Sequence, residues 1–368
     1  MKNFLASSEI AEIAEKVQNG ERLSFEDGLR LYQTKDFLAV GALAAAANRQ
    51  HNGEKVYFVQ NRHINPTNIC FSHCSFCSFR RNGNEPDAYI FTIPQIIERV
   101  KANFTPRTSE FHIVSGLHPD LDLDYYCELI QTLKENFPNV HIKAFTAVEI
   151  EYLGQLTKSS RETVLQKLHM AGLDAMPGGG AEIFAPRIRR KLCPEKVDAA
   201  GWLDIHGIAH RLGIKTNATM LYGHIEGIED RVDHLLRLRE QQDKTGGFMT
   251  FVPLAYHPMN NQLGKIHNLD FTTGIEDLRT IAISRLLLDN FAHIKGYWIM
   301  ITPALAQLSL AFGVSDLDGT VVEERIYHDA GASTDQQITR QELVKLIQAA
   351  QKIPVERDAL YREIEVFA

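Results

Sequence analysis

The chain has 368 residues and a net charge of −7, with 44% hydrophobic and 23% charged residues. This composition is ordinary for a globular protein, and no block of Lys and Arg forms a basic stripe, so we expect no nucleic-acid partner. The longest apolar-rich run, residues 37–47, is shorter than the ~20 residues that a membrane-spanning helix needs, and the N-terminus lacks a long apolar segment. We therefore expect a cytoplasmic protein with no membrane partner.

Helices are predicted over residues 1–54, with Ser24 and Asp27 spaced as an N-terminal cap. After residue 54, short β-branched or aromatic runs alternate with amphipathic stretches. The predicted strands cover residues 55–64, 109–116, 140–147, 172–178, 214–223, 248–254 and 293–300, with a possible eighth at 314–323. The predicted helices between them include residues 122–137, 160–172, 196–213 and 227–242.

Sustained strand–helix alternation indicates an α/β protein with a parallel sheet and crossover helices. Eight strands favour a (β/α)8 TIM-type barrel over an open doubly wound sheet, since the phosphate-binding pattern G-x-G-x-x-G is missing after the first strand. Thr339 and Glu342 have capping-box spacing ahead of a closing helix. We expect a single domain over 1–368, made of N-terminal helices (1–54), a barrel core (55–325) and a C-terminal helical extension (326–368).

Three cysteines, Cys70, Cys74 and Cys77, lie close together after the first predicted strand with the spacing C-x3-C-x2-C. In a barrel this position is the C-terminal mouth, where active sites form. Thiolates suit zinc or iron–sulfur clusters, but structural zinc normally takes four ligands. His73 adjoins Cys74 and Cys193 is distant, so neither is a good fourth ligand. The spacing therefore favours a cluster of four irons with one iron open to substrate, in a loop over 68–80, with zinc or buried structural cysteines as alternatives.

The pattern C-x3-C-x-aromatic-C after a first barrel strand resembles the radical S-adenosylmethionine (SAM) superfamily. The resemblance implies a 4Fe-4S cluster on Cys70, Cys74 and Cys77, with the amino and carboxylate groups of SAM on the fourth iron. One electron then cleaves SAM and releases a 5′-deoxyadenosyl radical. It also implies a low-potential one-electron donor of the flavodoxin or ferredoxin type as a partner.

Longer stretches resemble the aminofutalosine synthase family of the menaquinone pathway. These stretches are "NRHINPTNIC", "SGLHPDL", "HIKAFTAVEI", "MPGGGAEIFAPRIR", "KLCPEK" and "EERIYHDAGA". The resemblance implies addition of the adenosyl radical to the vinyl ether of 3-[(1-carboxyvinyl)oxy]benzoate, giving 6-amino-6-deoxyfutalosine, methionine and CO2 or bicarbonate. The alternative is a hydrogen-abstracting relative, either cyclic dehypoxanthinyl futalosine synthase or a deazaflavin-forming enzyme.

The resemblance also implies where SAM binds. Ser115 and Gly116, at the end of the second barrel strand, are expected to meet its methionine amino group, and Phe76 to lie along the adenine. Thr146 and Glu149 could bond the ribose hydroxyls or the amine, although Glu149 could simply open the next helix. Glycines let a backbone approach a ligand closely, so Gly179 and the following Glu182 are expected near the nucleoside, with a tight turn as the alternative.

The substrate carries carboxylates, so the cavity needs cations or neutral donors. Arg187 or Arg189 could supply a cation. His63 and Asn65 on or beside the first strand, Thr219 in the fifth and His257 after the sixth are the expected substrate and catalytic groups. Asn217 and Tyr222 are further candidates on the fifth strand. His257 could instead be a structural histidine.

Overall fold

A parallel sheet of seven strands forms the centre of the molecule, of which the computed structural model describes residues 2–367. Its strands lie in the order β2 (Asn61–Ile64), β3 (Glu110–Ile113), β4 (His141–Ala144), β5 (Ala175–Met176), β6 (Lys215–Tyr222), β7 (Phe248–Ala255) and β8 (His293–Ile294). Each neighbouring pair is parallel. The predicted parallel α/β sheet is confirmed.

An eighth segment joins the two edges of this sheet. It contains β9 (Asp316–Gly319), which lies within the predicted eighth strand. At the β8 edge the Ser315 N–H donates to the carbonyl of Ile294 over 3.0 Å. At the β2 edge the His63 N–H donates to the carbonyl of Val322 over 3.0 Å. The barrel predicted from eight strands is therefore built from seven laddered strands and this closing segment.

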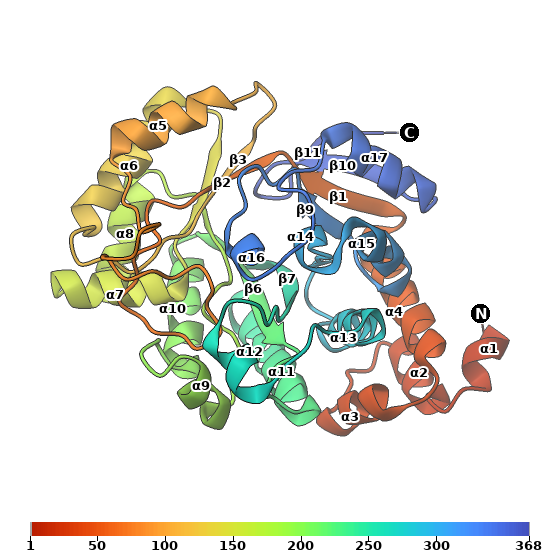
Figure 1. Ribbon diagram of the computed structural model, residues 1–368. Coiled ribbons are helices and arrows are strands. Elements are labelled where there is room, and N and C mark those ends of the chain that lie inside the picture. The colour runs from red at the N-terminus through yellow and green to blue at the C-terminus, as the bar shows by residue number, and fades with distance from the viewer. Residues whose placement is uncertain (1, 368) are drawn as a thin grey trace.

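A second, four-stranded sheet lies beside the barrel, with the order β11 (Glu363–Val366), β10 (Ile353–Arg357), β1 (Lys55–Val59) and β9. The predicted strand 55–64 is thus divided at Gln60, with β1 in this sheet and β2 in the barrel. The C-terminal extension, expected to be helical, contains the predicted helix α17 (Arg340–Ala349) but then adds β10 and β11. Figure 1 shows α17, β10 and β11 next to β1, near the C-terminus.

Helices surround the barrel on the outside (Figure 1). Those between the strands are α5 (Ile93–Ala102), α6 (Leu123–Asn136), α7 (Ala147–Thr157), α8 (Arg161–Ala171), α9 (Pro186–Leu192), α10 (Ala199–Arg211), α11 (Ile228–Thr245), α12 (Gln262–His267) and α13 (Gly274–Leu287). After β8 come α14 (Trp298–Ile301), α15 (Pro303–Ser309), the 3-10 helix η1 (Leu310–Phe312) and α16 (Ile326–Asp329). The prediction of a strand over 293–300 is therefore wrong at its end, where α14 begins at Trp298.

The N-terminal helices predicted over 1–54 are present as α1 (Lys2–Ala6), α2 (Ala11–Gln18), α3 (Phe25–Gln33) and α4 (Phe37–Asn52). Ser24 caps α3 as predicted: its hydroxyl accepts the Asp27 N–H, and the Asp27 carboxylate accepts the Ser24 N–H. Along the described helices, none combines the length and apolar character needed to span a bilayer.

Candidate active site

One large cavity lies at the C-terminal ends of the barrel strands, with a volume of about 1690 Å³ including its part open to solvent. Asn65, Arg187, Arg189 and Tyr222 do not line it, whereas the other site residues predicted from the sequence do. Those that line it are His63, Cys70, Cys74, Phe76, Cys77, Ser115, Gly116, Thr146, Glu149, Gly179, Glu182, Asn217, Thr219 and His257. They come from six successive strands, β2 to β7, or the loops that follow them, so the barrel brings together groups that are far apart in sequence.

The cysteine loop is held against the barrel by backbone hydrogen bonds. The Phe71 N–H donates to the Leu117 carbonyl over 2.8 Å, and the Ser75 N–H donates to the Leu192 carbonyl over 2.8 Å. Gly116 is required for this docking, because a Cβ there would lie 2.1 Å from the Ile69 carbonyl oxygen. The position of the cysteines therefore depends on the loop after β3 as well as on β2.

The three thiols share an apolar and cationic environment. Burial raises the pKa of Cys70 and raises that of Cys77 to about 11. Lys196 lies beside them, with its Nζ 5.1 Å from the centre of the Phe76 ring. Although burial opposes it, the charges of Cys74 and Glu182 raise the pKa of Lys196 well above its usual value. A fixed positive charge thus lies next to the thiols, where it favours the thiolate form that metals need.

Glu182 and Lys196 form a partly buried ion pair, with the Lys196 Nζ 2.8 Å from a carboxylate oxygen of Glu182. Glu182 adopts a positive φ of 45°, an unusual backbone conformation for a residue with a side chain. Glu182 was predicted from the sequence as a site residue, whereas Lys196 was not. The signal for Lys196 was its closeness in sequence to the glycine-rich stretch, which is weak without the fold.

Glu149 closes the space between the ends of β3 and β4. One carboxylate oxygen accepts the Ser115 N–H over 3.0 Å and the other accepts the Thr146 N–H over 2.7 Å. Thr146 in turn caps α7 by accepting the Glu149 N–H. Burial raises the pKa of Glu149 to about 7, despite these hydrogen bonds. Both readings of Glu149 from the sequence therefore have a structural basis, since it caps a helix and faces the cavity.

The glycines after β5 allow tight packing against neighbouring strands. A Cβ on Gly178 would lie 2.7 Å from the backbone of Ala218, and one on Gly179 would lie 2.8 Å from the Thr146 side chain. The Thr219 hydroxyl donates to the Gly178 carbonyl over 2.6 Å. The loop therefore presents its backbone to the cavity in a fixed position.

Alternation along β6 places Asn217, Thr219 and Leu221 toward the cavity. The Oδ1 atom of Asn217 is buried there without a hydrogen-bond partner in the described structure. Tyr222 points the other way, and its hydroxyl donates to Asp277 over 2.8 Å. The suggestion that Tyr222 faces the substrate is therefore wrong, because its position in the strand has the opposite phase.

Charged groups line the base of the cavity. Lys143 on β4 is buried and pairs with Glu110 over 2.6 Å. Lys295, just after β8, pairs with Asp318. His63 stacks on His112 with 4.6 Å between ring centres, and burial lowers the pKa of both. Neither lysine was predicted from the sequence, nor was Asp318, since no motif marks them.

His257 lines the opposite side of the cavity, where its ring contacts Tyr327 edge-on with 5.2 Å between ring centres. Burial lowers its pKa, and its Nε2 lies 3.1 Å from the Met300 carbonyl. A carbonyl can only accept, so the neutral ring carries its proton on Nε2. The Nδ1 atom, buried without a partner in the described structure, is left as an acceptor.

Three other predictions are corrected by the structure. Asn65 lies beyond the end of β2 and lines a separate, smaller pocket, because the alternation of side chains stops at Ile64. Arg187 points outward and pairs with Asp230 over 2.5 Å. Arg189 is buried and donates to the carbonyls of Ala181 and Val197. Neither arginine therefore lines the cavity as a partner for a carboxylate.

The residues of the cavity fit a 4Fe-4S cluster. Its three cysteines are unpaired, lie in one loop, and line the cavity together with the apolar side chains of Phe76 and Phe79. Between residues 2 and 367, no three His, Cys, Asp or Glu side chains converge as ligands of one metal ion. Each thiol in this arrangement can take a separate iron of a cluster, and apolar cover limits the access of solvent to it.

Comparison with known proteins agrees with this geometry. The family model of the radical SAM superfamily matches residues 64–238, and that of the CofH/MqnC C-terminal region matches residues 245–367. The chain is 53% identical to the aminodeoxyfutalosine synthase of Thermus thermophilus, over 96% of each chain. It is 44% identical to the aminodeoxyfutalosine synthase of Streptomyces coelicolor, over 95% of this chain and 92% of the relative.

More distant similarities extend to other radical SAM enzymes. The 5-amino-6-(D-ribitylamino)uracil–L-tyrosine 4-hydroxyphenyl transferase of Methanopyrus kandleri is 39% identical, over 84% of this chain and 85% of the relative. The crystal structure of methylornithine synthase has the same fold, with a TM-score of 0.73, 18% identity, and coverage of 93% of this chain and 96% of that one. Enzymes of this superfamily use a 4Fe-4S cluster and SAM. The chain therefore belongs to the radical SAM superfamily and, within it, to the family of the aminodeoxyfutalosine synthases.

Proposed function

We propose that this protein is a cytoplasmic transferase that joins the 5′-deoxyadenosyl group of SAM to 3-[(1-carboxyvinyl)oxy]benzoate. The products are 6-amino-6-deoxyfutalosine, methionine and CO2 or bicarbonate, in menaquinone biosynthesis. The observation that carries the proposal is the cavity that unites the three cysteines with the strand-end residues, in a chain 53% identical to an aminodeoxyfutalosine synthase.

Cys70, Cys74 and Cys77 would each hold one iron of the 4Fe-4S cluster and leave the fourth for SAM. When bound, the cluster supplies the electron that cleaves the sulfonium of SAM, and a flavodoxin- or ferredoxin-type protein would deliver that electron. Lys196 lies beside Cys74 and pairs with Glu182, so its charge offsets the negative charge of thiolates and cluster. Phe76 and Phe79 keep water away from the same region.

We assign SAM binding to the ends of β3, β4 and β5. Ser115 and Gly116 offer backbone groups beside the cysteine loop, and Glu149 holds the Ser115 N–H in place. Ionised Glu149 would also attract the positively charged amino group or sulfonium of SAM. Gly179 and Glu182 lie at the next strand end and would contact the nucleoside.

The aryl enol ether would occupy the rest of the cavity, between His63, Thr219 and His257. Asn217 has a free amide oxygen there, suited to a hydroxyl of the nucleoside or a proton on the substrate. His257 offers Nδ1 as an acceptor, so it is suited to take the proton that the arene loses when aromaticity returns. The apolar walls from Leu221, Val252 and Leu254 exclude water from the reacting carbon atoms.

The nucleoside product tests this proposal. Anaerobically reconstituted and reduced protein would be mixed with SAM and the enol ether, and the nucleosides separated by mass. We expect a product that retains adenine and is joined to the substrate by a new carbon–carbon bond. Free 5′-deoxyadenosine as the main nucleoside would instead favour a hydrogen-abstracting enzyme, such as a cyclic dehypoxanthinyl futalosine synthase or a deazaflavin-forming relative.

A further inference from the structure

A second pocket lies on the other side of His63 from the large cavity, and we call it the side pocket. It measures about 340 Å³ including its mouth. Its lining consists of Arg62, His63, Ile64, Asn65, Tyr89, Phe91, Ile96, Arg99, Val100, Glu323 and Arg325. Among residues 2–367, only His63 lines both spaces. The side pocket is therefore a neighbour of the reaction cavity and is not part of the cysteine site.

Positive charge exceeds negative charge in this lining. Arg62, Arg99 and Arg325 supply three guanidinium groups, and Glu323 supplies the one carboxylate among the lining residues. The Glu323 carboxylate forms ion pairs with both Arg62, over 3.0 Å, and Arg99, over 3.4 Å. Asp329, which does not line the pocket, also interacts with the charge of Arg325. In the large cavity Lys143, Lys196 and Lys295 each pair with a different carboxylate, whereas in the side pocket Arg62 and Arg99 share the single carboxylate of Glu323.

Arg62 is almost completely buried, with 2% of its surface exposed. Its NH2 atom donates to the Arg99 carbonyl over 2.9 Å, but its Nε and NH1 atoms have no partner in the described structure. Buried donors without partners are costly, so they indicate a place where a ligand or ordered water completes the hydrogen bonds. Burial also lowers the pKa of Arg62, which an anion nearby would reverse.

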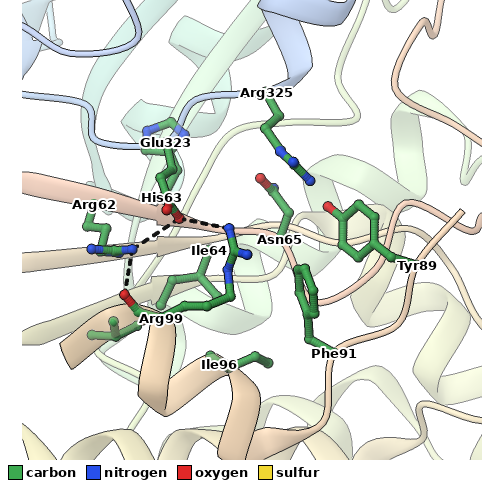
Figure 2. Close-up of a pocket in the computed structure, with 11 residues that line it drawn as sticks. Arg62, His63, Ile64, Asn65, Tyr89, Phe91, Ile96, Arg99, Glu323 and Arg325 are labelled. Carbon is green, nitrogen blue, oxygen red and sulfur yellow. Dashed lines mark hydrogen bonds and ion pairs between the residues drawn. The ribbon is translucent and has the colours of Figure 1, made fainter. Parts of the chain in front are cut away.

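The other two guanidinium groups come from different elements. Figure 2 shows Arg99, on α5, and Arg325, just before α16, reaching toward Asn65 from opposite sides, with Tyr89 and Phe91 beside them. Arg325 lies 5.2 Å from the centre of the Tyr89 ring. The planar fork of a guanidinium matches the two oxygens of a carboxylate, and two such forks can clamp one small anion.

The segment that separates the two spaces has an unusual backbone. Glu323 has a φ of 64° and Val321 a φ of 48°, both in the left-handed region that side chains disfavour. This conformation lets Glu323 and Arg325 face the side pocket while Glu324, between them, faces the large cavity. Backbone strain of this kind is retained where the arrangement of side chains has a use.

We infer that the side pocket binds a small carboxylate-type oxyanion, held by Arg99 and Arg325 and supported by Arg62. The identity of the anion rests on the proposed function. Two anions of the same chemical class are candidates. The anion is either a carboxylate of the bound substrate, reaching past His63, or the bicarbonate released from it. The site itself depends only on the arginines, so it can be tested without turnover.

The binding test uses cluster-reconstituted protein without SAM, titrated with 13C-labelled formate and 13C-labelled bicarbonate and followed by NMR line width. We expect Arg99→Gln and Arg325→Gln each to weaken binding by about tenfold, the loss of one charge-assisted hydrogen bond. The control is Arg107→Gln, an exposed arginine elsewhere that pairs with Glu365 over 3.0 Å and should leave binding unchanged. Arg325 is exposed, so its variant should fold and retain its iron.

The inference would be overturned if Arg325→Gln and Arg99→Gln bound formate and bicarbonate as tightly as the control Arg107→Gln does. If binding is lost as expected, kinetics then identify the source. Competition between formate and the enol ether, with a raised KM and little change in kcat in Arg99→Gln, assigns the site to the substrate carboxylate. Inhibition by bicarbonate that added substrate does not relieve assigns it to the released anion. Failure of the proposed function would leave the binding result intact.

Discussion

Glu149 shows how the fold sets the chemistry of one side chain. In the unfolded chain a glutamate loses its proton near pH 4.5, whereas the folded protein holds that of Glu149 until about pH 7. The folded state therefore binds more protons across this interval, and its stability falls as pH rises from about 4.5 to 7. Glu149→Gln should remove this part of the pH dependence. The variant should also lose one of the two hydrogen bonds that the carboxylate accepts from backbone N–H groups.

Urea unfolding at pH about 5 and about 7.5 measures the effect. We expect the drop in unfolding free energy between the two pH values to be smaller in Glu149→Gln than in the wild type. Glu98→Gln, an exposed glutamate on α5, is the control and should keep the wild-type drop. An equal drop in all three proteins would show that the ionisation of Glu149 does not respond to its burial.

Gly116 tests the docking of the cysteine loop. In Gly116→Ala the new Cβ would meet the Ile69 carbonyl, and the backbone on one side must move, at a cost of about 1–3 kcal/mol or more. We expect the variant to fold but to retain much less iron after anaerobic reconstitution. Gly83→Ala is matched to it, because its Cβ would lie 3.9 Å from the Ile69 side chain, an ordinary contact. Equal iron content in the two variants would contradict the account.

Residues that line the cavity can be predicted from the sequence where a local pattern marks them. Cys70, Cys74 and Cys77 stand out by spacing, and Gly116 and Glu149 by their place after a strand. Lys143 and Lys295 could not be found in this way, because only the twist and register of the barrel decide which side of a strand faces inward. Asn65 was assigned to the wrong space because the strand ends one residue before it.

At the scale of elements, α9 and the loop before it act as a unit. Arg189 on α9 donates to the carbonyls of Gly180, Ala181 and Val197, and so ties the glycine loop to the start of α10. Lysine cannot make these bonds with a single ammonium group. Arg189→Lys should therefore lower the unfolding free energy by about 2–4 kcal/mol, estimated from the loss of two or three hydrogen bonds.

Chemical denaturation of Arg189→Lys and Arg187→Lys provides the comparison. Arg187 is on the same helix but is exposed, and its pair with Asp230 is worth about 1 kcal/mol or less. We expect the two variants to differ clearly in stability. If both variants lose the same small amount of unfolding free energy, the buried Arg189 does not anchor the loop.

Helices with strong periodicity were predicted correctly, whereas the two strands near the C-terminus were not predicted. The helices α6, α8, α10 and α11 lie within two or three residues of their predicted bounds, because their apolar faces repeat over several turns. β10 and β11 gave no such signal. β10 contains Pro354, which disfavours a strand, and its pairing with β1 joins segments from nearly opposite parts of the chain.

For the whole molecule, one buried ion pair links the C-terminal sheet to the barrel. Arg357 on β10 lies 2.7 Å from Asp316 on β9, and both are buried. Asp316→Asn would leave Arg357 without its counter-charge, at a cost of about 3–5 kcal/mol. Glu54 forms an ion pair with Lys352 nearer the surface, and Glu54→Gln removes one partner of it. This substitution should lower the unfolding free energy by about 1 kcal/mol or less.

Thermal and urea unfolding of these two variants test whether the second sheet supports the barrel. β9 also joins the edges of the barrel, so the loss should appear as one cooperative transition at a lower temperature. A variant of Asp316 as stable as that of Glu54 would mean that the pair contributes little to the closure of the barrel.

The central claim is that Cys70, Cys74 and Cys77 hold a 4Fe-4S cluster with one iron left for SAM. Electron paramagnetic resonance of the anaerobically reconstituted and reduced protein, recorded before and after SAM is added, tests it most directly. We expect the signal of a reduced 4Fe-4S cluster in the wild type, a shift of that signal with SAM, and loss of both in Cys77→Ala. A signal that SAM leaves unchanged, or a Cys77→Ala variant that keeps the wild-type cluster and its shift, would contradict the account.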